Sequence, residues 1–148
     1  MNFVQDAHSH VSENSDCRLH HIGMVVESID RTAPSVARSL GGTWDGKTFR
    51  DPLQLVRVTF LSGRSPRDPL IELVEPDGEK SPVINFLKRG GGLHHLCYEV
   101  KALEAQLDFI RSIGGMIAKP PLPAVAFGGR SIAWVFTKDS LLIEYLEQ

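Results

Sequence analysis

The sequence has 148 residues, of which 42% are hydrophobic, and its 16 basic and 18 acidic side chains give a net charge of −2 at pH 7. This length favours one domain, which would bury about two-thirds of the surface of its unfolded chain. The near-neutral charge provides no electrostatic footprint for nucleic acid or for an anionic membrane, so we expect a small molecule as the partner.

Cysteine usage and hydropathy predict the compartment. The two cysteines are Cys17, in a polar N-terminal stretch, and Cys97, in an expected buried strand, so no disulfide framework is predicted. No apolar run approaches the roughly 20 residues that span a bilayer, and residues 1–16 lack the apolar centre of a signal peptide. We therefore expect a cytoplasmic protein with a flexible leader over residues 1–17.

The first half of the chain predicts a β-α-β-β-β module over about residues 19–79. A β-branched, apolar run predicts a strand over 19–26, and apolar spacing predicts a helix over 28–40 that ends at a glycine pair. Alternating apolar residues predict a strand over 53–61, and a further strand is expected over 70–74. Turn formers separate these strands.

The second half repeats this order over residues 93–148. A helix over 81–89, opened by Ser-Pro, joins the two halves. The expected elements that follow are a strand over 93–100, a helix over 103–113 and short strands over 116–118, 131–136 and 141–146. The proline-rich segment 120–123 cannot donate regular ladder hydrogen bonds, so it is expected at a sheet edge or in a loop. Residues 18–148 are thus predicted to form one domain of two modules.

The two halves also repeat their polar residues. His21 and His95 each follow Leu-His, and they lie 74 positions apart, whereas Glu72 and Glu144 each follow an isoleucine and lie 72 positions apart. If an internal two-fold relates the modules, these equivalent positions become neighbours. Two imidazoles and two carboxylates suit one divalent ion such as Co, Mn, Ni, Zn or Fe.

Each of these residues has a structural alternative. A histidine on an apolar strand is usually a core residue, but finding two at equivalent positions beside equivalent glutamates favours metal ligands. Glu72 and Glu144 sit in apolar strands, where an unpaired carboxylate costs several kcal/mol, so they require a metal or a cationic partner. Strict alternation places His20 and His94 on the opposite face, where they would pack or support the ligands.

The motif order Leu-His-His-Ile-Gly, Ile-Glu-Leu-Val-Glu-Pro, Gly-Gly-Leu-His-His-Leu and Leu-Ile-Glu resembles methylmalonyl-CoA epimerases of the vicinal oxygen chelate (glyoxalase/bleomycin resistance/dioxygenase) superfamily. The resemblance covers about residues 19–148. It implies an α+β fold in which two tandem βαβββ modules form a curled mixed sheet around a metal site, and a homodimer. It implies the metal ligands His21, Glu72, His95 and Glu144.

The sequence departs from the epimerase pattern at two places. Leu53 stands where epimerases usually carry an acid/base glutamate, a few residues before a Val-Arg-Val strand. The segment 126–130 keeps a glycine and a cation, Arg130, but lacks the histidine of the family's Gly-x-His-Gly-Lys loop. Arg130 is predicted to bind a substrate carboxylate or a CoA phosphate, with an exposed turn as the alternative.

The predicted function is that of an enzyme, a metal-dependent isomerase or epimerase that abstracts an α-proton from a small acyl thioester. Glu144 is the first choice of catalytic base and Glu72 the second. Two alternatives stay open: a glyoxalase-type lyase that acts on a hemithioacetal, and a metal-free small-molecule-binding protein of the same fold.

Overall fold

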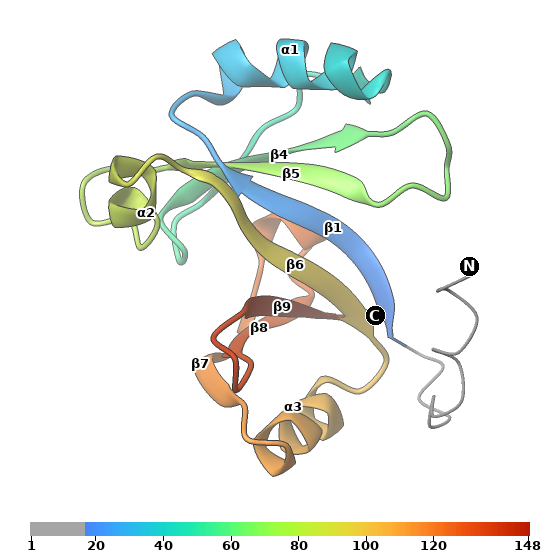
Figure 1. Ribbon diagram of the computed structural model, residues 1–148, viewed down its shortest axis with the longest axis vertical. Coiled ribbons are helices and arrows are strands. Elements are labelled where there is room, and N and C mark those ends of the chain that lie inside the picture. The colour runs from blue at the N-terminus through green and yellow to red at the C-terminus, as the bar shows by residue number, and fades with distance from the viewer. Residues whose placement is uncertain (1–16) are drawn as a thin grey trace, which may run out of the picture.

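The computed structural model describes residues 17–148, which form a curled mixed sheet with two helices packed on it (Figure 1). In chain order the elements are β1 (Arg18–Val25), α1 (Ile29–Leu40), β2 (Thr43–Trp44), β3 (Phe49–Asp51), β4 (Val56–Ser62), β5 (Leu70–Pro76), α2 (Ile84–Lys88), β6 (Gly92–Val100), α3 (Leu103–Ser112), β7 (Met116–Pro123), the 3-10 turn η1 (Val125–Phe127), β8 (Ser131–Phe136) and β9 (Leu142–Glu147). The predicted leader lies outside the described residues, except for Cys17.

An internal two-fold relates the halves of the sheet. The strand order is β2-β4-β5-β1-β6-β9-β8-β7, with β3 paired to β4. β1 and β6 pair antiparallel at the centre, and each pairs in parallel with the last strand of its own module, β5 or β9. The order outward from the centre is therefore equivalent on both sides, which confirms the predicted α+β fold of two modules.

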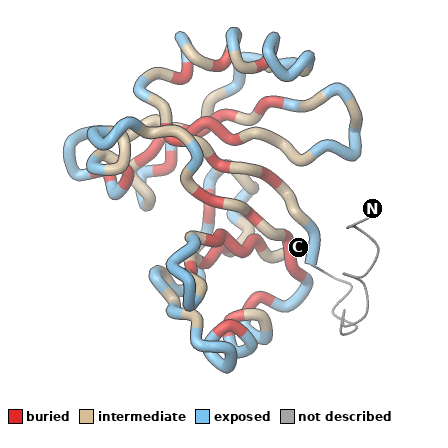
Figure 2. Tube along the Cα trace, viewed as in Figure 1, coloured by how far each residue is buried: buried red, intermediate tan, exposed pale blue. Residues whose placement is uncertain are grey.

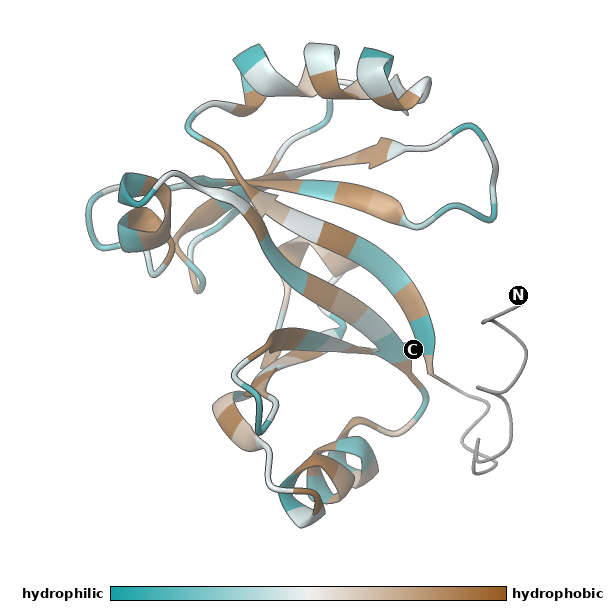
Figure 3. Ribbon diagram, viewed as in Figure 1, coloured by the Kyte–Doolittle hydropathy of each residue, from teal (hydrophilic) through white to brown (hydrophobic). Residues whose placement is uncertain are grey.

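Helices α1 and α3 cover the outer faces of the two half-sheets (Figure 1). Ile29 of α1 packs with Leu61 and Leu73 of its half-sheet, and Leu107 of α3 packs with Val135 in the other half. Figure 2 shows buried residues along the strands and on the sheet side of these helices, and Figure 3 shows apolar residues in the same places. With the outer faces covered by helices, the inner concave face is left for a site.

The two main helices begin with related caps. Ser28 accepts a hydrogen bond from the backbone N–H of Arg31 at the start of α1, and Glu75 accepts from the N–H of Ile29 at 2.8 Å. In the second module Glu147 accepts from the N–H of Leu103 at 3.4 Å. The last strand of each module thus supplies a carboxylate that caps its own helix, where a negative charge also suits the helix dipole.

Three elements differ from their predicted bounds by three residues or more at one end. The strand expected over 53–61 begins only at Val56, because Leu55 has φ 55° and breaks the extended backbone. Helix α2 is shorter than predicted, and β7 is longer and includes the proline segment, as an edge strand paired only to β8. Among residues 17–148, no helix combines the length and the hydropathy needed to cross a bilayer.

Candidate metal centre

Four central strands carry the predicted metal ligands to one point on the concave face. His21 comes from β1, Glu72 from β5, His95 from β6 and Glu144 from β9, and all four are at least 94% buried. One ligand atom from each lies within 4.8 Å of the others. The two-fold explains this convergence, because each module supplies a histidine from its first strand and a glutamate from its last.

The short distances between these atoms fit one divalent ion. His21 Nε2 lies 3.2 Å from His95 Nε2 and 3.3 Å from Glu72 Oε2. Glu144 Oε2 lies 3.1 Å from His21 Nε2, yet this buried oxygen has no hydrogen-bond partner among residues 17–148. Two imidazole nitrogens and two carboxylate oxygens that face one point, one of them without a hydrogen bond, form a donor set that suits a divalent ion.

Gly23 gives the His95 ring its space. It is the cross-strand partner of His95, and a Cβ at this position would lie 2.0 Å from His95 Cε1. Any larger residue would push the imidazole out of its position. Gly23 of the first module therefore makes room for the candidate ligand His95 of the second module.

The charges of the cluster shift every pKa within it. Burial by itself lowers the pKa of His21, but the charge of Glu72 and interactions with Cys97 and Glu144 outweigh it and raise the pKa to about 12. The pKa of His95 is likewise raised by both glutamates despite its burial. Burial raises the pKa values of Glu72 and Glu144, but the two histidines hold them below their usual range. Without an ion, protons on the imidazoles therefore supply the positive charge.

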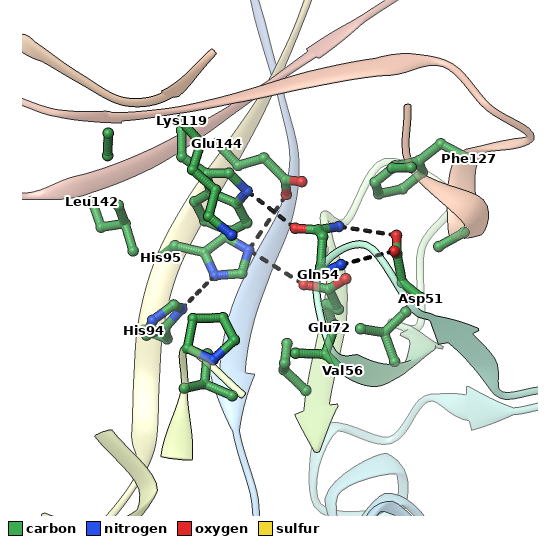
Figure 4. Close-up of a pocket in the computed structure, with 18 of the residues that line it drawn as sticks. Asp51, Gln54, Val56, Glu72, His94, His95, Lys119, Phe127, Leu142 and Glu144 are labelled. Atoms are coloured by element: carbon green, nitrogen blue, oxygen red, sulfur yellow. Dashed lines mark hydrogen bonds and ion pairs between the residues drawn. The ribbon is translucent and has the colours of Figure 1, made fainter. Parts of the chain in front are cut away.

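The histidine that precedes each ligand lies at a β-bulge. Between β1 and β6 the register skips His20 on one strand and His94 on the other. A bulge interrupts strict alternation, so both side chains turn towards their neighbours instead of the opposite face. His20 Nδ1 lies 2.9 Å from His21 Nδ1. His94 Nδ1 lies 3.0 Å from His95 Nδ1 (Figure 4). The prediction that His20 and His94 lie on the opposite face of the sheet is therefore wrong. Their contacts with His21 and His95 agree with the predicted role of supporting the ligands.

These two histidines orient the ligand rings. Burial, together with the charge of His95, lowers the pKa of His94 to about 4, so its ring is neutral at pH 7. The pKa of His20 is lowered by burial and by His21. A neutral ring that accepts a hydrogen bond from the Nδ1–H of its neighbour leaves the neighbour's Nε2 lone pair free for an ion.

A second group of candidate ligands, His20, His21 and Cys97, is less suitable. Cys97 is fully buried, and burial, with the nearby charge of Glu144, raises the pKa of its thiol to about 12. A thiol ligand must be a thiolate to bind a metal, so this group is the poorer donor set.

A cavity of about 290 Å³ opens beside the cluster, and both modules line it (Figure 4). Its walls are mostly apolar, with Val56, Val58 and Phe127 among them, and Glu72, His95 and Glu144 border it. The centre is therefore accessible to a small molecule with an apolar portion.

Gln54 spans this cavity. Its side-chain amide donates to Asp51 Oδ2 at 3.1 Å and accepts from Trp134 Nε1 at 3.2 Å, so it links the two modules (Figure 4). Asp51 is buried and also accepts from the backbone N–H groups of Leu53, Gln54 and Val125. The alternation of Gln54 with Val56 and Val58 is visible in the sequence, but Trp134 and Lys119, which also line the cavity, carry no local signal.

The structure places two other predicted positions away from the cluster. Leu53 is 61% exposed and does not line the cavity. The Arg130 guanidinium donates to Glu99 Oε1 at 2.7 Å and to the carbonyl of Glu147 at 3.3 Å, and it also lies outside the cavity lining. The role of Arg130 in binding a substrate stays a prediction, and its guanidinium already forms an ion pair with Glu99.

Metal affinity is expected to rise with pH. Since the pKa of His21 is about 12 without an ion, its proton must leave before Nε2 can bind a metal. Each proton displaced strengthens the apparent affinity by about tenfold per pH unit below that pKa. Co²⁺ titrations at pH 6, 7 and 8, with proton release measured in two buffers, test this expectation. An affinity independent of pH would contradict it.

Comparison with known families identifies the class of protein to which this fold and its four-residue centre belong. The family model of the glyoxalase/bleomycin resistance protein/dioxygenase superfamily matches residues 20–134, and the chain belongs to this superfamily. Within it, the chain is similar to methylmalonyl-CoA epimerases.

Individual relatives agree with this placement. An ethylmalonyl-CoA/methylmalonyl-CoA epimerase of Cereibacter sphaeroides is 30% identical over 124 residues, which cover 82% of this chain and 90% of the relative. The crystal structure of the Mycobacterium tuberculosis methylmalonyl-CoA epimerase has a TM-score of 0.77 at 26% identity, over 94% of this chain and 91% of that one. A Streptomyces coelicolor methylmalonyl-CoA epimerase variant in complex with 2-nitronate-propionyl-CoA has a TM-score of 0.75 at 26% identity, over 90% and 96%.

Proposed function

We propose that this chain is a divalent-metal-dependent isomerase that removes the α-proton of a small acyl thioester, as a methylmalonyl-CoA epimerase does. One observation supports the proposal most directly: the buried cluster of His21, Glu72, His95 and Glu144 borders an apolar cavity formed by both modules. Relatives that are epimerases, one of them in complex with an acyl-CoA analogue, support the choice of thioester.

The four residues would hold the ion, and the cavity would hold the acyl group. A bound divalent ion supplies Lewis-acid stabilisation of negative charge on carbonyl oxygens. The apolar wall, with Val56, Val58 and Phe127, excludes water from the acyl group and strengthens every charge interaction in the cavity.

Glu144 is the proposed base. It borders the cavity, so its carboxylate is close enough to take a proton from a substrate carbon held there. Glu72 also borders the cavity and is the alternative.

No second base stands opposite Glu144 at the position that the epimerase pattern predicts. Leu53 is there, exposed and aliphatic, and the next residue, Gln54, has an amide that cannot accept a proton at neutral pH. Asp51 borders the cavity too, but its two oxygens accept hydrogen bonds from three backbone N–H groups and from Gln54. These bonds occupy the carboxylate, so we assign Asp51 to holding Gln54 in place.

We expect the substrate's α-proton to exchange with solvent faster than the substrate is epimerised. A single base returns a proton to the face from which it removed one, so the α-proton of single-enantiomer methylmalonyl-CoA should exchange with deuterated water before stereochemistry is lost. Metal-loaded protein is incubated with the thioester, and deuterium incorporation and enantiomeric composition are followed separately. Spontaneous exchange without protein is the control.

The outcomes separate the candidate functions. Equal rates of exchange and epimerisation would reveal a second base on the opposite face. No exchange with any thioester, at full metal occupancy, would contradict the proposal and favour a glyoxalase-type lyase or a small-molecule-binding protein. Assembly as a homodimer and a cytoplasmic location are also proposed, and sedimentation and cell fractionation test them.

A further inference from the structure

Two loops, one from each module, meet at the cavity. The connection between β3 and β4 spans residues 52–55, and the connection between β7 and β8, which contains η1, spans residues 124–130. Each joins the two strands that precede the last strand of its module, so the loops are equivalent under the internal two-fold. Gln54 of the first loop and Phe127 of the second line the cavity (Figure 4). We call the two loops together the clasp.

Asp51, the last residue of β3, joins the two loops. Its Oδ1 accepts hydrogen bonds from the backbone N–H groups of Leu53 and Gln54, at 3.0 and 3.1 Å. Its Oδ2 accepts from the Gln54 side chain at 3.1 Å and, across the module boundary, from the N–H of Val125 at 3.3 Å. Asp51 is 2% exposed, and no lysine, arginine or histidine nitrogen among residues 17–148 lies within 4.0 Å of its carboxylate. Four N–H groups therefore stabilise this buried charge.

The clasp covers the predicted ligands from the cavity side. The Phe127 ring stacks on the His21 ring, with centroids 5.8 Å apart. Gln54 spans the cavity that the other three ligands border, and its amide oxygen accepts from Trp134 Nε1 at 3.2 Å. Because all four ligands are at least 94% buried, an ion reaches them only when groups that cover them move.

The backbone of the clasp suits it to such a movement. Neither loop belongs to a strand of the sheet, and Leu55 has φ 55°, which is unfavourable for a residue with a Cβ. Gly128 and Gly129, at the end of the second loop, also have positive φ. Opening would expose Asp51 to water, which hydrates the carboxylate in place of the lost N–H groups and so limits the cost. Local opening draws on irregular segments of this kind.

We propose that the clasp is a gate to the metal centre and that Asp51 holds it closed through its hydrogen bonds to both loops. This inference rests on the metal-dependent function proposed above. An ion or a small molecule enters when the bonds from Asp51 to Gln54 and Val125 break and the loops separate. The gate closes in free and loaded protein alike, so it sets the rates of entry and release and leaves the dissociation constant unchanged.

The test measures entry and release of Co²⁺ separately. Release is followed by mixing loaded protein with a chelator at concentrations where the rate no longer depends on the chelator. Entry is followed by rapid mixing of metal-free protein with Co²⁺ and by the quenching of tryptophan fluorescence, since the Trp134 ring lies 4.7 Å from that of His95. Equilibrium titration gives the dissociation constant independently.

Asp51→Asn keeps the shape of the side chain but replaces one acceptor oxygen by an NH₂ group, which cannot accept these bonds. We expect entry and release both to become faster by about tenfold or more, since a hydrogen bond to a charged group is worth that factor, with the dissociation constant unchanged. Asp45→Asn is the matched control. Asp45 is exposed, does not line the cavity and accepts from the backbone N–H of Lys47, so this variant should change neither rate.

Amide hydrogen exchange of metal-free protein shows whether Asp51 holds both loops. In Asp51→Asn the amides of both loops, 52–55 and 124–130, should exchange faster, while those of β1 and β6 stay protected. Faster exchange in residues 52–55 alone would show that another contact holds η1, and the inference would be wrong.

The kinetic outcomes separate a gate from other roles. Unchanged rates in Asp51→Asn would mean that ions reach the centre by another route. Faster release with unchanged entry, and hence weaker affinity, would mean that Asp51 supports the ligands. Either result overturns the inference and leaves the proposed function intact, whereas wild-type protein that binds no metal overturns both. If Asp51→Asn does not fold, Gln54→Met, which removes the side-chain bonds to Asp51 and Trp134, takes its place and should accelerate both rates.

Discussion

Replacing His95 by alanine is expected to reduce bound metal from about one ion per chain to nearly none. The imidazole Nε2 lies 3.2 Å from His21 Nε2 and 3.3 Å from Glu72 Oε2, so its loss removes one of four converging ligand atoms. It also leaves two buried carboxylates with one histidine, and buried charges without partners are costly. Metal content after dialysis against Co²⁺, measured by atomic emission, is the readout.

His94→Ala is the matched control for this experiment. His94 lies next to His95 in sequence and contacts its Nδ1 at 3.0 Å, but its own ring is not among the four converging ligands. Loss of such an orienting partner typically weakens metal affinity by about 10- to 100-fold without removing the site. Saturating metal should therefore fill His94→Ala and not His95→Ala. Full occupancy in His95→Ala would show that the assignment of ligands is wrong.

The fold could be predicted because both halves of the sequence indicate the same order of elements. The order of strand, helix and three strands is present in both halves, so a weak signal in one module is supported by the other. The four clustered residues were found in the same way, since His21 and His95 occupy equivalent positions, as do Glu72 and Glu144. Buried glutamates in apolar strands are also rare enough to be informative by themselves.

The features that the sequence did not predict arise from backbone irregularities and from contacts between strands that are distant in sequence. Bulges at His20 and His94 break the two-residue period from which the direction of each side chain was predicted. Leu55, with its positive φ, ends the alternation that had been extended to Leu53. Lys119 reaches the cavity only because β7 pairs with β8 in one register, and local periodicity does not determine the register between strands.

Glu144→Gln is expected to separate metal binding from proton transfer. Glutamine keeps a carbonyl oxygen that can still serve as a ligand, but it cannot accept a proton at neutral pH. Loss of a general base typically costs about 10²- to 10⁴-fold in rate, so we expect α-proton exchange of methylmalonyl-CoA to fall by that factor while the variant still fills with metal. Exchange into deuterated water and metal content are measured on the same preparation.

Glu72→Gln provides the comparison that assigns the base. Glu72 and Glu144 are equivalent under the internal two-fold, are buried to a similar extent and lie at similar distances from His21 Nε2, 3.3 Å and 3.1 Å. A general loss of charge at the centre would therefore slow both variants alike. If Glu144 is the base, Glu72→Gln keeps most of the exchange rate. The reverse pattern would make Glu72 the base, and equal, small losses in both variants would mean that neither carboxylate removes the proton.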